Sequence, residues 1–135
     1  MLNVCAQRLA NALQDKDLKY QTDIANDGTS VILLPFQGKV VRMFFSGENG
    51  KYLSLYLIFE RVPDEKVTDV ILKCNELNCQ YKWISFYVDK DKDITLQNDA
   101  ILTESTAADI AFELLIRMLQ ISDEVKPAIM KAIYA

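Results

Sequence analysis

The sequence predicts an α+β domain in which an antiparallel sheet of about five or six strands carries helices mainly on one face. Two observations lead to this fold class. Between residues 20 and 60, short segments of alternating apolar and polar residues are separated by turn residues, which is typical of an antiparallel meander. Before and after this region, apolar residues recur at helical spacing. The length of 135 residues fits a single domain, 1–135, with enough chain to bury a core.

The first half of the chain supplies one helix and four strands. An apolar stripe at helical spacing predicts a helix from about Leu2 to Asp15. Turn residues then mark reversals at Asp27-Gly28, at Pro35–Gly38 and at Asn49-Gly50, and the last pair is the clearest signal for a type I′ hairpin turn. The strands expected around these turns lie near residues 20–24, 31–34, 40–46 and 52–59.

The second half places helices around a two-stranded hairpin. Asp64 is positioned to cap a second helix, and Asn75 to Cys79 are expected to end it, because asparagine tolerates the left-handed backbone common at helix ends. Two strands follow, near residues 81–88 and 94–96, joined by an acidic turn. A third helix begins near Thr106, whose hydroxyl is expected to cap it, and a short last helix follows Ser122.

The strands near residues 52–59 and 81–88 each have an aliphatic side and a side rich in Tyr, Trp and Ser. Because side chains alternate across a sheet, the aliphatic sides face the core and the aromatic sides share the opposite face. Two interpretations of that face stay open. Its aromatic residues are half-covered by a helix or loop, or they form a groove for a peptide or a small ligand. The residues expected to make such contacts are Tyr52, Tyr56, Trp83 and Tyr87.

The third helix carries a second apolar stripe beside the one expected to pack on the core. A helix on the surface of a monomer needs only one such stripe. The second stripe either packs under the last helix or is buried against another copy of the chain in a homodimer. It is formed by Phe112, Ile116 and Leu119.

The sequence offers little for catalysis. It contains no histidine, which excludes Ser-His and Cys-His pairs, and its four glycines form no phosphate-binding loop. Three cysteines without histidine are too few for the usual zinc site. The acidic run Asp89–Asp93 lacks the glycine and the final glutamate of an EF-hand loop, which favours a solvated hairpin turn. We therefore expect no enzymatic activity, catalytic residue, metal or cofactor.

Charge and hydropathy restrict the kinds of partner. The net charge is -4 and the 15 basic residues form no run, so we expect no nucleic-acid partner. No apolar segment approaches the roughly 20 residues that cross a bilayer, and the N-terminus lacks the pattern of an export signal. An odd number of cysteines suits a reducing compartment. These features predict a cytoplasmic protein with no membrane partner.

Three segments carry a family resemblance: Lys73-Cys74-Asn75-Glu76-Leu77-Asn78, the strand Trp83–Asp89, and Asp93-Ile94-Thr95-Leu96. Together with the order of helices and strands, they resemble the YbjN-type domain, also called the bacterial sensory transduction regulator family. Cys74 stands where the family usually has leucine or another apolar residue. In pattern the resemblance covers most of the chain, whereas the sequence motif itself is short.

The resemblance implies the two-layer fold of type III secretion chaperones, which are small, acidic, cytoplasmic and often dimeric proteins that bind extended segments of their partners. It implies no catalytic residues. Asn75 and Asn78 match the family motif, and we expect their amides to satisfy free carbonyls at the helix end and to fix the start of the next strand. The expected function is a non-enzymatic chaperone-like or regulatory protein that binds a protein or peptide partner. The alternative is a small-molecule sensor that uses the aromatic sheet face.

Overall fold

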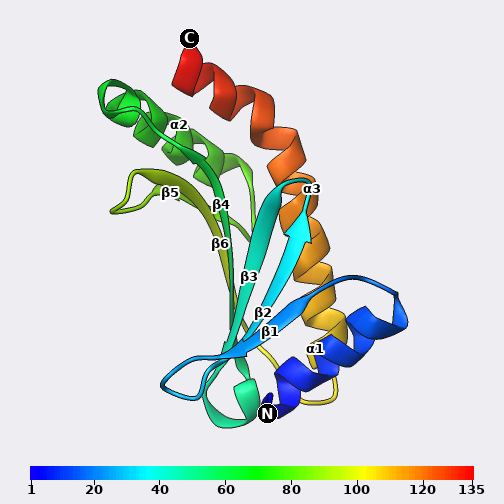
Figure 1. The fold of residues 1–135 in the computed structure, drawn as a ribbon. Coiled ribbons are helices and arrows are strands. Elements are labelled where there is room, and N and C mark those ends of the chain that lie inside the picture. The colour runs from blue at the N-terminus through cyan, green and yellow to red at the C-terminus, as the bar shows by residue number, and fades with distance from the viewer.

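A computed structural model describes all residues, 1–135, as one antiparallel sheet with three α-helices. The strands are β1 (Gln21–Ile24), β2 (Ser30–Phe36), β3 (Lys39–Ser46), β4 (Tyr52–Arg61), β5 (Ser85–Val88) and β6 (Asp93–Ile101). They are ordered β1-β2-β3-β4-β6-β5. The helices are α1 (Val4–Asp15), α2 (Val67–Gln80) and α3 (Ala107–Tyr134). Figure 1 shows α1 and α3 on the same face of the twisted sheet, with α2 beside β5. The predicted α+β class is confirmed.

The core lies between the sheet and the helices, because alternate side chains of each strand point to the helical layer. Met43 of β3, Leu55 of β4 and Leu96 of β6 are each 0% exposed. The long helix α3 contributes a row of side chains, each 1% exposed or less: Leu115, Met118, Val125, Ile129 and Ile133. Full burial of one such side chain stabilises the fold by about 1.5–3 kcal/mol. The opposite face of the sheet does not contribute to this core.

Asn3 fixes the start of α1 to the sheet. Its side-chain oxygen accepts a hydrogen bond from the Ala6 N–H at 3.2 Å, and its amide donates to the Phe45 carbonyl at 2.8 Å. The turn between β3 and β4 packs against it, and a Cβ on Gly50 would overlap the Asn3 side chain. This turn has the predicted type I′ character, since φ is 59° at Asn49 and 75° at Gly50.

The turn between β2 and β3 differs from the expectation in one respect. Pro35 lies inside β2, where its partner is Val40, and does not form the reversal. The chain reverses at Gln37 and Gly38, whose φ angles are 50° and 79°. Proline is tolerated here because β1 pairs with β2 only as far as Leu33, so β2 is an edge strand at Pro35.

The second helix starts later and ends later than the sequence predicts. Asp64 does not cap α2: it lies in a 3₁₀ turn, and its carboxylate pairs with the Lys92 ammonium at 2.5 Å. The expected left-handed end between Asn75 and Cys79 is also wrong. α2 continues to Gln80, and the next residue, Tyr81, is extended with φ at -111°.

The strand predicted for residues 81–88 is shorter in the structure. β5 contains only Ser85–Val88, because Trp83 has a φ of 77°, a left-handed conformation that no strand accommodates. Residues 81–84 are instead the connector between α2 and β5. Alternation of residue types predicted that Trp83 lies on the strand. Alternation, however, carries no information about the sign of a residue's φ angle.

The predicted third and last helices form a single helix. α3 runs through Pro127 without a break, and Figure 1 shows it bending along its length. Proline inside a helix costs about 3 kcal/mol. That cost is offset because the apolar stripe continues beyond it, with Val125, Ile129 and Ile133 each 1% exposed. Thr106 precedes the helix but its hydroxyl makes no capping bond. None of the three helices combines the length and the hydropathy that a membrane span requires.

Candidate functional site

The face of the sheet opposite α1 and α3 is the candidate functional site, and we call it the open face. In Figure 1 two hairpin turns, β1–β2 and β5–β6, project toward the left, away from α1 and α3. Between them the sheet is hollowed, and this hollow has a volume of about 780 Å³ and is open to solvent. Its floor comes from β3, β4, β6 and β5, and its rims come from the two turns.

The floor of the hollow is aromatic. Phe44 of β3 and Tyr56 of β4 meet edge to face, with ring centroids 5.6 Å apart and planes at 78°. Tyr87 of β5 also lines the floor, and its hydroxyl donates to the Gln97 side-chain oxygen at 2.7 Å. Partial burial, with Tyr56 and the nearby carboxylates, raises the pKa of Tyr87 above its ordinary value. Aromatic groups held in this way offer a rigid surface for contact.

The rims of the hollow are acidic turns whose carboxylates have partners within the chain. Asp27 accepts a hydrogen bond from the Thr29 N–H at 3.0 Å, which lowers the pKa of Asp27. Asp89 accepts from the Asp91 and Asp93 N–H groups at 2.9 and 3.0 Å, and from the Thr95 hydroxyl at 3.0 Å. The acidic run therefore forms a hairpin turn, as the sequence favoured, and its first carboxylate is used to hold that turn.

The structure brings together two of the aromatic residues singled out from the sequence. Tyr56 and Tyr87 both line the hollow. Tyr52 belongs to the same face of β4 but lies outside the hollow, 56% exposed, with its ring packed where a Cβ on Gly47 would be. Trp83 is 63% exposed in the connector before β5. Only Tyr56 and Tyr87 share the hollow, and a contact role for the four aromatic residues stays a prediction.

Two asparagine side chains hold the connector that carries Trp83. The Asn78 amide donates to the Phe86 carbonyl at 3.0 Å and accepts from the Phe86 N–H at 2.7 Å. Asn98 on β6 donates to the Trp83 carbonyl, while its own oxygen has no partner. Asn78 thus fixes the start of β5, as expected, whereas Asn75 is exposed and forms no side-chain hydrogen bond.

The second stripe of α3 is partly used within the chain. Leu119 is 8% exposed and belongs to the core. Phe112 is half-buried, with the Lys16 ammonium 4.8 Å from its ring centroid. Ile116 is half-buried as well. No separate last helix exists to cover the stripe, so the homodimer remains a prediction in which Ile116 and Phe112 supply the accessible surface.

The cysteines do not form a site. Cys5 and Cys74 are buried and Cys79 is exposed, and all are free thiols. Burial raises the pKa of Cys74 to about 11, so this thiol stays protonated and unreactive at neutral pH. No three potential ligand side chains gather closely enough to hold a metal ion.

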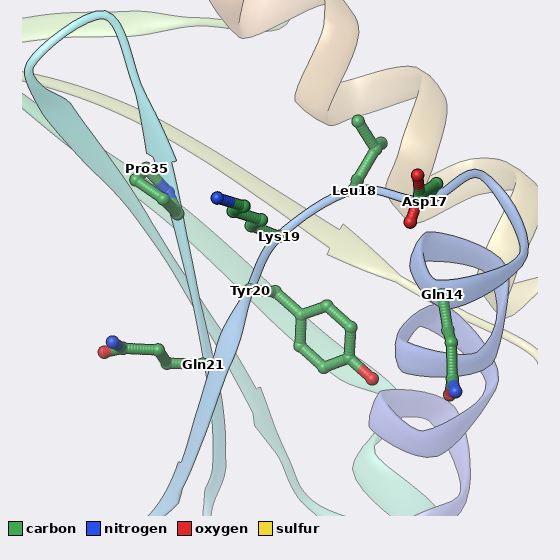
Figure 2. Close-up of a pocket in the computed structure, with 7 residues that line it drawn as sticks. All are labelled: Gln14, Asp17, Leu18, Lys19, Tyr20, Gln21 and Pro35. Atoms are coloured by element: carbon green, nitrogen blue, oxygen red, sulfur yellow. The ribbon is translucent and has the colours of Figure 1, made fainter.

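A second hollow, of about 570 Å³, lies between the end of α1 and the start of β1. Figure 2 shows that its polar side chains do not converge, since Lys19 and Gln21 point away from Gln14. None of the residues singled out from the sequence lines it. A binding site needs several polar groups aimed at one ligand. The open face is therefore the better candidate.

Sequence reasoning missed Arg42 and Phe44, which line the floor of the hollow. The signal was present, because both alternate with the buried residues Val41, Met43 and Phe45 of β3. What the sequence does not give is the strand order that places Arg42 directly beside Tyr56.

Two solved structures with a similar fold show which class of fold this is. The crystal structure of the Yersinia pestis type III secretion chaperone SycH in complex with a stable fragment of YscM2 matches with a TM-score of 0.56 and 14% sequence identity, over 89% of this chain and 98% of that chain. The crystal structure of the ExsC-ExsE complex matches with a TM-score of 0.51 and 11% identity, over 90% of each chain. The fold is that of type III secretion chaperones, as the resemblance implied.

The family follows from the sequence match. Residues 6–127 match the YbjN family, described as "Putative bacterial sensory transduction regulator". Because this match spans nearly the whole chain, the protein belongs to the YbjN family. No curated protein matches the sequence.

Proposed function

We propose that this protein is a non-enzymatic binding protein of chaperone or regulatory type that holds an extended segment of a partner protein on the open face. The observation that carries the proposal is the uncovered sheet face with an aromatic floor, Phe44, Tyr56 and Tyr87, between two raised turns. A hollow of this shape accepts a chain in extended conformation, and tyrosine rings supply contact area at low entropic cost.

The comparisons support a binding role of this kind. Both similar structures are complexes, one with a fragment of YscM2 and the other named as the ExsC-ExsE complex. The family description points to regulation. A chain of this family and fold is thus expected to act through a protein partner, in the cytoplasm, and not through catalysis.

Substitution of Tyr56 tests the proposal. Tyr56→Arg places a charged, differently shaped side chain on the floor of the hollow, and we expect it to weaken partner binding by about 2 kcal/mol or more, as for an interface hot spot. The partner is captured with tagged protein from the cells that naturally produce it, and its amount is measured by quantitative mass spectrometry. Tyr134→Arg is the matched control, because Tyr134 is a 69% exposed tyrosine at the end of α3.

The result that opposes the proposal is equal recovery of the same partner by Tyr56→Arg and wild-type protein. If only Tyr134→Arg lost the partner, we would infer that the binding site lies on the helical side of the molecule. Thermal unfolding of each variant checks the fold, and we expect it to be intact because Tyr56 is only half-buried.

Small-molecule sensing by the same face is the second candidate function. The volume of the hollow, about 780 Å³, falls in the range of ligand pockets. However, ligand pockets usually enclose most of their ligand, and this hollow is open along the sheet. A screen for small molecules that raise the unfolding temperature separates the two functions, because only a ligand of the folded state does so.

We also propose a homodimer through the accessible part of the second α3 stripe. Ile116 and Phe112 are the half-buried apolar residues on that stripe. Such an interface leaves the open face free in each copy, since α3 lies on the opposite side of the sheet.

A further inference from the structure

Arg42 is the one arginine in the lining of the open-face hollow, and it lies on the β3 side of the floor. It faces Tyr56 on β4 and Leu33 on β2 across the sheet. Lining residues extend beyond it on both sides along the strands, Ser46 toward one end and Ile58 toward the other. A segment lying in the hollow would therefore pass directly over its guanidinium.

The Arg42 guanidinium has no partner in the protein. It takes part in none of the salt bridges and donates no hydrogen bond, although its side chain is half-buried. Several other polar groups of the lining already have partners inside the chain. The carboxylates of Asp27 and Asp89 accept hydrogen bonds inside their own turns, and the Tyr87 hydroxyl is bonded to Gln97. Arg42 alone on the floor combines a full charge with unused donors.

A guanidinium presents five N–H donors in a planar fork that matches a carboxylate with two parallel hydrogen bonds. Its charge is retained at every physiological pH, and it is less strongly hydrated than an ammonium group. Lys90, the other cation of the lining, lies exposed on the rim turn, whereas Arg42 is half-buried on the floor. The floor thus combines an aromatic surface with one half-buried guanidinium whose donors are unused.

We propose that Arg42 selects partner segments that carry an aspartate or glutamate side chain at the position lying over β3. The inference rests on the proposed function, because it names the chemistry of the segment that the open face holds. The occupant is an acidic side chain within the segment and not a C-terminal carboxylate. The hollow continues on both sides of Arg42, so a bound segment extends past it in both directions. Apolar or aromatic residues next to the acid lie against Phe44, which follows Arg42 along β3, and Tyr56, which pairs with Arg42 on β4.

A phage-displayed library of random peptides provides the test. It is selected separately on immobilised wild-type protein, on Arg42→Gln and on Arg117→Gln. Arg117 is an exposed arginine of α3, paired with Glu113, so this control makes the same charge change far from the open face. We expect peptides from the wild type and from Arg117→Gln to share an Asp or Glu at one position, and peptides from Arg42→Gln to lack it.

The strongest wild-type peptide is then remade with the shared acid replaced by its amide. We expect this change to weaken binding to the wild type about tenfold or more, the usual effect of losing a charge-assisted hydrogen bond. It should leave binding to Arg42→Gln unchanged. Binding is measured by fluorescence anisotropy, and thermal unfolding confirms that Arg42→Gln is folded.

The outcomes separate this inference from the proposed function. Peptides without a shared acid, or acidic peptides that bind Arg42→Gln as tightly as wild type, overturn the role of Arg42 while leaving peptide binding in place. Peptides whose binding is unaffected by Tyr56→Arg do not occupy the open face, and this result overturns both. So does a selection that yields no binding peptide at all.

Discussion

At the scale of single residues, Asn78 and Arg42 differ in whether their side chains form hydrogen bonds within the protein. Asn78 uses both its donor and its acceptor on the backbone of Phe86. Arg42 uses no donor on the protein. A polar group whose bonds are satisfied internally stabilises the fold, whereas a half-buried cation with free donors has capacity for another molecule. By this criterion Asn78 is structural, and Arg42 is assigned to the proposed binding face.

The two asparagines of the family motif allow a matched test of this distinction. Asn78→Ala leaves the buried Phe86 backbone without two hydrogen bonds, and we expect it to lower the free energy of unfolding by about 1–3 kcal/mol. Asn75→Ala removes an exposed side chain from a helix, so we expect a change within about 0.5 kcal/mol. Urea denaturation measures both. Equal midpoints for the two variants would contradict the assigned role of Asn78.

The residue scale also shows where sequence reasoning succeeds. The Asn78 side chain bonds the backbone at the start of the next strand, in the place that the motif predicted. Neither motif asparagine bonds a carbonyl at the end of α2, which the motif also predicted. The left-handed conformation expected at Asn75 to Cys79 is found at Trp83 instead. Asparagine adopts that conformation more readily than tryptophan does. The Trp83 backbone is held by a hydrogen bond from Asn98, and local sequence does not show this bond because Asn98 is distant in the chain.

At the scale of elements, α3 shows why local signals are insufficient. Pro127 and the Ser122-Asp123-Glu124 stretch predict a new helix, yet the helix is continuous from Ala107 to Tyr134. The Ser122 hydroxyl donates to the Leu119 carbonyl and so serves the existing helix. Long-range burial of the residues after Pro127 decides the outcome, and burial of that kind is not visible in a short window of sequence.

The proposed homodimer belongs to this scale, because its surface is a face of α3. Ile116→Glu places a charge on the accessible stripe, and we expect it to convert the dimer to a monomer while the fold is kept. Size-exclusion chromatography with light scattering measures the mass. Ile110→Glu is the control, since Ile110 is a 37% exposed isoleucine on the first turn of the same helix. A wild-type protein that is monomeric at micromolar concentration would contradict the dimer.

At the scale of the whole molecule, the two faces of the sheet differ, and this difference leaves one face accessible to a partner. One face is sealed by the helices around a core of 32 buried residues, and the other exposes aromatic and charged side chains. Alternation along the strands predicted this division, and the fold class, from the sequence. The hollow was beyond prediction, because its shape depends on strand order, sheet twist and two turns far apart in the chain.

The central claim, that the open face holds the partner segment, is tested most directly by site-specific crosslinking in living cells. A photoreactive benzophenone side chain replaces Tyr56 in one strain and Tyr134 in another. We expect irradiation to join the protein to its partner from position 56 and not from position 134, with the joined partner peptide containing an acidic residue. A partner joined only from position 134, on the helical side, would contradict the claim.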